Sequence, residues 1–241
     1  MNAFLVSFLF TFNISTAPIK VAVIDTGSNS LHKLKLCKTG HVDFTKNPIK
    51  YYTNDDLLNE EQYNFKDHDS HGTNISHLIE AHAKNSNYCQ IIIKYYNVDG
   101  ETGSVINTLK AFRHAIKEKV NIINYSSVGY TSINSEKIII KDILKNNIIL
   151  VTSAGNDTKN LDLNCNAFPA CYYKDTIVVG SGFNSKQKAK YSNYGKVVDV
   201  WINGDHQKAN GTEMSGTSQS TAITTGKLVR MLHKMRTLLN E

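Results

Sequence analysis

Arginine is scarce in this sequence, and most of its positive charge is carried by lysine. Only Arg113, Arg230 and Arg236 are arginines among 27 basic residues, which face 21 acidic ones and give a formal net charge of +6. Arginine is the residue that proteins favour for bidentate recognition of phosphates and bases. The lysines are also scattered along the chain. The charge therefore indicates a solvated surface rather than a polyanionic partner, and we expect no nucleic acid as a partner.

A long apolar run is also missing. The apolar stretch from Ala3 to Ile14 is too short to span a bilayer, so no stable membrane span is expected. Its length, followed by Ser15-Thr16-Ala17, is typical of a signal peptide over residues 1–17. No Lys or Arg precedes the run and Pro18 follows it, so a buried N-terminal strand or helix is the alternative. We expect a secreted or periplasmic protein, or a cytoplasmic one if this segment is not a signal.

Metal-binding cysteine motifs are absent as well. The four cysteines, Cys37, Cys89, Cys165 and Cys171, form no CxxC pair and no Cys/His zinc spacing. An even number behind a signal peptide permits two disulfides, and Cys165 and Cys171 are close enough to close a small loop. Reduced, buried thiols are the alternative.

The remaining composition is that of an ordinary soluble globular chain. Its 241 residues are 41% hydrophobic and 20% charged, without repeats or low-complexity linkers, which excludes disordered, collagen-like and coiled-coil classes. Short β-branched runs predict parallel strands at 21–24, 91–93, 121–124, 148–151, 176–179 and 197–200. Apolar residues with helical spacing predict helices at 104–119, 135–146 and 217–239.

This alternation predicts an α/β fold, a three-layer α/β/α sandwich with a mostly parallel central sheet. On the helices we expect burial of Val105, Leu109, Phe112 and Ile116, of Ile139 and Ile143 after a Ser135 cap, and of Ile223, Leu228, Leu232, Met235 and Leu239. We expect one domain over residues 18–241. In such sheets the active site lies at the carboxyl ends of the strands.

Asp25-Thr26-Gly27 follows the first predicted strand. A carboxylate at the end of a strand, before a Gly that lets the backbone turn, is a common way to fix an acid. The same letters also resemble half of a pepsin-like aspartic protease site, which needs a second carboxylate sharing one proton. No second copy exists in the sequence, so that chemistry would require a homodimer, and a plain turn is a third possibility.

His71 lies in Asp69-Ser70-His71-Gly72-Thr73, at the start of a helical pattern. Histidine is the natural general base near neutral pH. The alternatives are a solvated side chain or a metal ligand, and no H-E-x-x-H pattern supports the latter.

Ser218 follows Gly216-Thr217 and opens the last predicted helix. Amide dipoles at a helix start favour negative charge, which a nucleophilic serine generates beside itself during attack. An ordinary helix cap is the alternative.

Asn156 comes directly after a buried strand and the small residues Ser153-Ala154-Gly155. Its side-chain amide could donate to a developing oxyanion, although an Asn turn after a strand is more common.

Taken together, these motifs occur in the order Asp, His, Ser, which is the chain order of subtilisin. From about Lys20 to Arg236 the sequence resembles the subtilisin-like serine proteases, or subtilases. The resemblance rests on Val-Ile-Asp25-Thr-Gly, His71-Gly-Thr-x-Ile-Ser, Ser153-Ala-Gly-Asn156 and Gly-Thr-Ser218-x-Ser. Ile123-Asn124-Tyr125-Ser126 is similar to the substrate-binding strand of the family, and Phe168-Pro169 stands where the family tends to have a cis bond.

The resemblance implies a serine endopeptidase in which Ser218 attacks, His71 transfers the proton and Asp25 orients the imidazole. Asn156 and the Ser218 backbone N–H would bind the oxyanion. Two walls of the P1 pocket would come from Ser126, Ser127, Val128 and Gly129 on one side and from Ser153, Ala154 and Gly155 on the other. Extended substrate would pair with the first wall as an added strand. Small residues on both walls favour an apolar P1 side chain. Strand order in the family makes Cys37–Cys89 a plausible second disulfide.

The sequence departs from the family at several positions. Ala222 or Ile223 replaces a proline after the nucleophile, His77 replaces a small residue, and Val128 replaces a glycine next to the substrate. No inhibitory pro-domain is expected before Asp25. The sequence shows no clear acidic loop for structural calcium, so no cofactor and no metal are expected.

Two other functions fit the same motifs. One is a catalytically silent subtilase fold used for binding, although all four catalytic positions are intact. The other is acyl transfer to an amine, that is, peptide ligation. An aspartic protease would leave His71, Asn156 and Ser218 without a role. We expect protein or peptide substrates and a monomer.

Overall fold

The computed structural model describes residues 16–59, 66–96 and 104–240. The predicted signal peptide lies outside the described residues, apart from its last two positions. Within the part of the chain that the structure describes, no helix is both long and apolar enough to cross a membrane.

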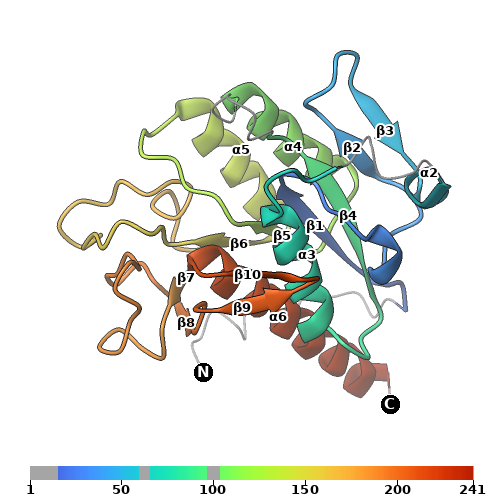
Figure 1. Ribbon diagram of the computed structural model, residues 1–241. Coiled ribbons are helices and arrows are strands. Elements are labelled where there is room, and N and C mark those ends of the chain that lie inside the picture. The colour runs from blue at the N-terminus through green and yellow to red at the C-terminus, as the bar shows by residue number, and fades with distance from the viewer. Residues whose placement is uncertain (1–15, 60–65, 97–103, 241) are drawn as a thin grey trace.

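An eight-stranded sheet forms the centre of the molecule, with the strand order β3-β2-β4-β1-β5-β6-β7-β8 (Figure 1). All neighbouring strands are parallel except β2 and β3. The strands are β1 (Ile19–Asp25), β2 (His41–Asp43), β3 (Lys50–Tyr52), β4 (Tyr88–Lys94), β5 (Ile122–Tyr125), β6 (Ile149–Ser153), β7 (Ile177–Ser181) and β8 (Val200–Ile202). A separate antiparallel hairpin consists of β9 (Gln207–Ala209) and β10 (Thr212–Met214).

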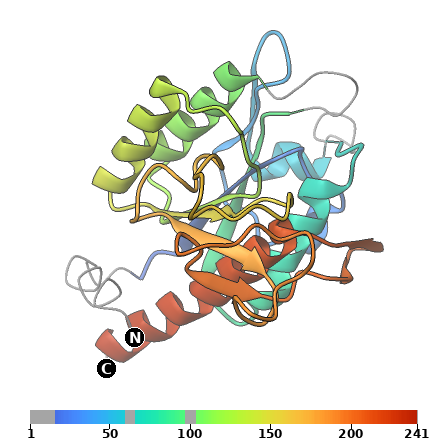
Figure 2. The ribbon, with the colours of Figure 1, turned by 90° about the vertical axis from the view of Figure 1, so that its left-hand side faces the viewer.

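Helices cover both faces of this sheet (Figure 2). One face carries α3 (His71–His82) and α6 (Thr217–Asn240), and the other carries α4 (Val105–Lys117) and α5 (Asn134–Lys145). The short elements η1 (Leu31–Lys33) and α2 (Asn54–Asn59) complete the described set. The expected three-layer α/β/α sandwich is therefore confirmed.

The alternation of side chains along β1 explains the two cores. Ile19, Val21 and Val23 pack with α3 and α6, whereas Ala22 and Ile24 pack with α4 and α5. Successive side chains of a strand point to opposite faces, so a strand that is apolar at every position is covered on both sides. All five of these side chains are fully buried.

Several local predictions need correction. Of the predicted strand at 197–200 only Val200 belongs to β8, because the N–H of Val198 bonds back to Gly195 in a turn and only from Asp199 on does the backbone bond to β7. Helix α5 starts at Asn134 and has no side-chain cap, so Ser135 is not its cap. Two expected core residues, Val105 and Leu239, are 40% and 58% exposed, since each lies in the terminal turn of its helix.

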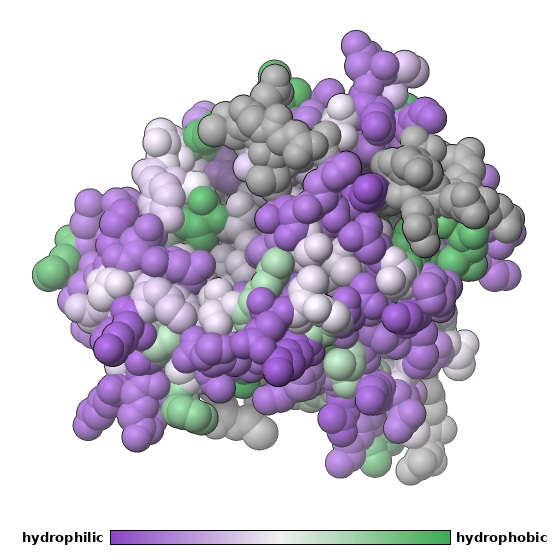
Figure 3. All heavy atoms as spheres, in the orientation of Figure 1, coloured by the Kyte–Doolittle hydropathy of each residue, from purple (hydrophilic) through white to green (hydrophobic). Residues whose placement is uncertain are grey.

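Both disulfides considered from the sequence are present. Cys37–Cys89 ties the segment before β2 to β4, and Cys165–Cys171 closes a short loop. The Phe168–Pro169 bond is cis, as the resemblance implies. The face seen in Figure 3 is mainly hydrophilic with small, separate hydrophobic spots, in agreement with the expectation of a solvated surface.

Candidate active site

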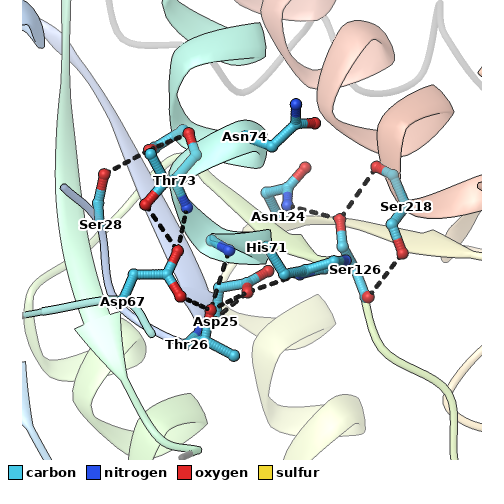
Figure 4. Close-up of polar contacts among 12 residues, drawn as sticks. Asp25, Thr26, Ser28, Asp67, His71, Thr73, Asn74, Asn124, Ser126 and Ser218 are labelled. Atoms are coloured by element: carbon cyan, nitrogen blue, oxygen red, sulfur yellow. Dashed lines mark hydrogen bonds and ion pairs between the residues drawn. The ribbon is translucent and has the colours of Figure 1, made fainter. Parts of the chain in front are cut away.

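Asp25 and His71 form a hydrogen-bonded pair at the carboxyl end of β1 (Figure 4). The Nδ1 atom of His71 lies 2.8 Å from Oδ1 of Asp25, and only a protonated nitrogen can donate to a carboxylate. Asp25 is 4% exposed, and the same oxygen accepts the backbone N–H of Thr26 at 2.8 Å. The Nε2 atom of His71 is thereby left as the ring nitrogen for further chemistry.

Gly72 allows the start of α3 to approach β1 this closely. A Cβ atom at this position would lie 2.3 Å from the carbonyl oxygen of Gly27 and 3.0 Å from Oδ1 of Asp25. No larger residue fits without moving the backbone, so this glycine sets the approach of His71 to Asp25.

A second carboxylate, that of Asp67, supports the pair, although no motif in the sequence pointed to it. Asp67 is 2% exposed; its Oδ1 accepts the Thr26 hydroxyl at 2.8 Å, and its Oδ2 accepts the N–H and hydroxyl of Thr73 at 2.7 and 2.6 Å. The Thr26 oxygen in turn accepts the N–H of Gly72 at 2.9 Å. One carboxylate therefore ties the turn after β1 to the first turn of α3. Its signal in the sequence is an acidic residue just before a helix start, where backbone N–H groups lack partners.

Charges around His71 determine its protonation. Burial has the largest single effect and lowers its pKa, but the charge and hydrogen bond of Asp25, together with the charges of Asp69 and Asp67, raise the pKa from 6.5 to about 9. An opposite charge at hydrogen-bond distance favours the charged form of a histidine.

Ser218 lies in the first turn of α6 and is held by Ser126, the residue after β5. Its hydroxyl donates to the Ser126 carbonyl at 3.0 Å, and the Ser126 hydroxyl donates to the Ser218 carbonyl at 3.2 Å (Figure 4). Among the described residues no hydrogen bond joins the hydroxyl of Ser218 to His71. In the absence of substrate such catalytic bonds are often long or unmade.

Asn156 is anchored to the same helix start. Its Oδ1 accepts the N–H of Thr217 at 2.9 Å and the Thr217 hydroxyl at 2.8 Å, which leaves Nδ2 to face the turn before α6. A carbon placed at the Cβ position of Gly216 would lie 2.9 Å from Oε1 of Gln219, 3.4 Å from this Nδ2 and 3.7 Å from the backbone nitrogen of Ser218. Two donors therefore adjoin one small volume beside Ser218.

The first predicted substrate wall lines a cavity of about 440 Å³, together with Asp25 and His71. This wall consists of Ser126, Ser127, Val128 and Gly129. Gly129 already pairs with Phe168 through two backbone hydrogen bonds of 2.9 and 2.8 Å, so its main chain is occupied.

The second predicted wall lies elsewhere. Ser153, Ala154 and Gly155 are buried at the end of β6 and do not line this cavity. The N–H of Gly155 reaches the Thr217 hydroxyl at 3.3 Å, which places this wall next to the start of α6.

Two other positions flagged in the sequence are accommodated. His77 is buried, with Nε2 at 3.1 Å from the carbonyl of Asn29, and Val128 is half-buried. In the ranges 16–59, 66–96 and 104–240 no three His, Cys, Asp or Glu side chains gather as a metal site would require.

Comparisons with known proteins identify the family of the chain. The subtilase family (peptidase family S8) matches residues 16–241. The "Major intracellular serine protease" of Bacillus subtilis is 29% identical over 230 residues, which are 87% of this chain and 67% of that protein. Subtilisin E of Bacillus subtilis is 26% identical over 236 residues, 92% of this chain and 57% of that protein. The chain thus spans about three fifths to two thirds of the length of these curated relatives.

Solved structures share the fold. A lanthipeptide protease superposes with a TM-score of 0.74 at 20% identity, covering 92% of this chain and 75% of that one. A cold-adapted subtilisin-like serine proteinase superposes with a TM-score of 0.70 at 21% identity, covering 95% of this chain and 83% of that one. The family match spans all of the described residues, and the chain belongs to the subtilase family of serine proteases.

Proposed function

We propose that this protein is a serine endopeptidase that uses Asp25, His71 and Ser218, with Asn156 in the oxyanion hole. The observation that carries the proposal is the 2.8 Å Asp25–His71 bond at the end of β1, next to β5, because Ser126, the residue after β5, is hydrogen-bonded to Ser218. Family membership and serine protease relatives support the same activity.

In the first half of the reaction, the Ser218 hydroxyl leaves the Ser126 carbonyl by a rotamer change and attacks the scissile carbonyl carbon. Its proton passes to Nε2 of His71 as the new C–O bond forms. The electron pair of the carbonyl moves to its oxygen, which receives hydrogen bonds from Asn156 Nδ2 and the Ser218 N–H. Asp25 keeps the proton on Nδ1 and stabilises the imidazolium.

In the second half, His71 returns its proton to the leaving amine as the C–N bond breaks. Water then attacks the acyl carbon while His71 accepts its proton, and the C–O bond to Ser218 breaks as His71 returns that proton to the Ser218 oxygen, which releases the acid. An amine in place of water would give ligation.

Substrate in this proposal extends along Ser126–Val128, and its P1 side chain enters between that segment and Ser153–Gly155. Small residues on both sides favour an apolar P1 residue. Among the described residues, no backbone hydrogen bond of Ser127 or Val128 is formed, so their main-chain groups remain for an added strand.

Labelling with a fluorophosphonate tests the activated nucleophile. We expect an adduct on Ser218, located by mass spectrometry, that is absent in Ser218→Ala and His71→Ala and retained in Ser185→Ala, a matched change in an exposed loop. Cleavage of an unstructured protein should be lost in the same two variants. A folded protein that does not label at pH 9 would favour the silent binding fold, and coupled products in the presence of an added amine would favour the ligase.

We also propose that the protein acts outside the cytoplasm, as a monomer and without a metal cofactor. The two disulfides support an oxidising compartment, whereas two relatives are named intracellular serine proteases. Fractionation of the producing cell tests the location, because an active protein found only in cytosol would contradict it. Light scattering checks the monomer, and activity unchanged in EDTA checks the metal.

A further inference from the structure

The cavity beside the Asp25–His71 pair is larger than a catalytic pair needs, and its far wall has no role in the proposed reaction. It is enclosed by the ends of β1, β4 and β5 and by the first turns of α4 and α5. Its aromatic walls are Tyr95, Tyr96 and Tyr125. Ile133 and Glu136, at the start of α5, form another wall of the cavity.

The charged groups of this cavity are predominantly acidic. Among the residues that the structure describes, Asp25, Asp69 and Glu136 line it, His71 is the one basic residue of the lining, and no Lys or Arg belongs to it. The whole chain carries a net charge of +6, so this local excess of acid runs against the overall balance. A cleft lined by one sign of charge in a low-dielectric surrounding attracts ligands of the opposite sign.

Glu136 is the acidic residue of this lining that is not engaged with the catalytic pair or the bulk solvent. It is only 8% exposed, and its Oε2 accepts the hydroxyl of Tyr172 at 2.9 Å. No ion pair of Glu136 is formed within the described part of the chain. Burial raises its pKa, and the Tyr172 hydrogen bond opposes this only in part. An opposite charge at a short distance favours the charged form of such a carboxylate.

The aromatic walls suit the stem of a long cationic side chain. The Tyr95 and Tyr125 rings lie 5.8 Å apart between centroids, and Tyr95 and Tyr96 lie 6.1 Å apart. Lysine and arginine bury their methylene groups on such surfaces, and their charged heads are attracted to tyrosine faces.

We infer that this cavity binds a Lys or Arg side chain of the peptide substrate and that Glu136 is the residue that selects it. This inference rests on the proposed function. Successive side chains of an extended peptide point to opposite sides. The cavity adjoins His71 and lies on the side of the peptide opposite to the P1 pocket. A side chain that enters it therefore belongs to P2 or P4. Substrates with a basic residue at that position are selected over neutral ones.

Cleavage of matched peptides tests the selection. Peptides differ only by lysine or norleucine, which have similar length, at P2, P3 or P4. We expect kcat/KM of the wild type to be about tenfold higher for lysine at P2 or P4, as for a charge-assisted contact, and equal for both at P3. The preference should shrink at high salt. These three comparisons need no variant and therefore do not depend on how well a variant folds.

Variants then assign the preference to Glu136. Glu136→Gln keeps an oxygen for the Tyr172 hydroxyl, and we expect it to reduce the lysine preference to within about twofold, since the charge is gone. Asp142→Asn is the matched control, because it removes the same charge from the same helix without touching the cavity. It should keep the full preference. Equal rates for lysine and norleucine in the wild type, or an unchanged preference in Glu136→Gln, would overturn the inference.

Binding to the Ser218→Ala protein separates this inference from the proposed function. Calorimetry with the same peptides should show tighter binding of the lysine peptide, lost in the Ser218→Ala/Glu136→Gln double variant. If the wild type cleaves nothing but this binding preference holds, the proposed function fails and the cationic site stands. If neutral peptides are cleaved and lysine gives no advantage in either assay, the function stands and the site fails.

Discussion

Replacing Asp25 by Asn would remove the negative charge that faces His71 and keep an oxygen at nearly the same place. In the wild type, burial lowers the pKa of His71 and the Asp25 carboxylate raises it to about 9, against 6.5 in the absence of these interactions. The difference corresponds to about 3 kcal/mol in favour of the protonated ring. The side chains of His71 and Asp25 are 26% and 5% exposed, so solvent screens this pair weakly.

In Asp25→Asn we expect the pKa of His71 to fall to 6.5 or below, because burial remains and the main opposing charge is gone. The assay is an NMR titration of labelled histidine in the Ser218→Ala background, which prevents autolysis. His41, whose pKa burial lowers to about 4, is an internal control that should not move. A His71 pKa that stays above about 8 would refute the reasoning and assign the stabilisation to other carboxylates.

The same pair links stability to pH. Between pH 6.5 and 9 the folded protein binds a proton at His71 that the unfolded chain has released. The stabilisation is therefore complete below pH 6.5 and is lost as pH rises through about 9. Urea unfolding measures the difference in free energy of unfolding between the wild type and Asp25→Asn. We expect this difference to be about 3 kcal/mol larger at pH 6 than at pH 10. Asp55→Asn, an exposed carboxylate on α2, should show no such change.

Activity should follow the opposite direction. Because His71 must be neutral to accept the Ser218 proton, kcat/KM should rise with pH up to about 9. A plateau already reached at pH 7 would contradict the raised pKa.

Three further predictions concern the supporting structure. Asp67→Ala leaves the Thr26 and Thr73 donors without their acceptor, so we expect the free energy of unfolding, measured in urea, to fall by about 3 kcal/mol and kcat/KM to fall with it. Asp67→Asn should lose less stability. Equal stability of Asp67→Ala and wild type would contradict this. Removing the Cys37–Cys89 disulfide opens a loop of 52 residues, and by the chain-entropy relation the double serine variant should lose about 4 kcal/mol of its free energy of unfolding. Thermal unfolding measures this loss. The Cys165–Cys171 bond closes a loop of only 6 residues, so its double serine variant should lose less stability. Burial lowers the pKa of His41 to about 4, so the free energy of unfolding should fall by about 3 kcal/mol as pH drops from 6.5 to 4. In His41→Gln this dependence of stability on pH, measured by urea unfolding at each pH, should be weaker. An equally steep dependence in the variant would assign it to other groups.

Much of the architecture follows from local patterns. Strands β1, β4, β5, β6 and β7 and helices α4, α5 and α6 lie close to their predicted ranges, because a buried strand is apolar throughout and a covering helix is apolar every three or four residues. The short elements β2, β3, α2, β9 and β10 were not predicted, because runs of three to six residues carry too little periodicity. The other errors are at ends, such as Val105, Leu239 and the strand before Val200. At these positions the apolar pattern of the sequence continues, although no neighbouring layer covers the side chains.

The candidate site was predictable only in part. Asp25, His71, Asn156 and Ser218 stand out because short motifs place polar side chains at strand ends and helix starts. Asp67 and Glu136 stand in no such motif. Asp67 becomes important through Thr26 and Thr73, and Glu136 through a cavity that three strands and two helices close.

The sequence by itself determined the class of fold and the order of the polar motifs, since both depend on residues that are neighbours along the chain. Only the tertiary structure decided the protonation of His71, the hydroxyl contact between Ser218 and Ser126, and the acidic lining around Glu136. The physical reason is that desolvation, charge and hydrogen bonding are set by groups from distant segments, and no local pattern records which segments meet.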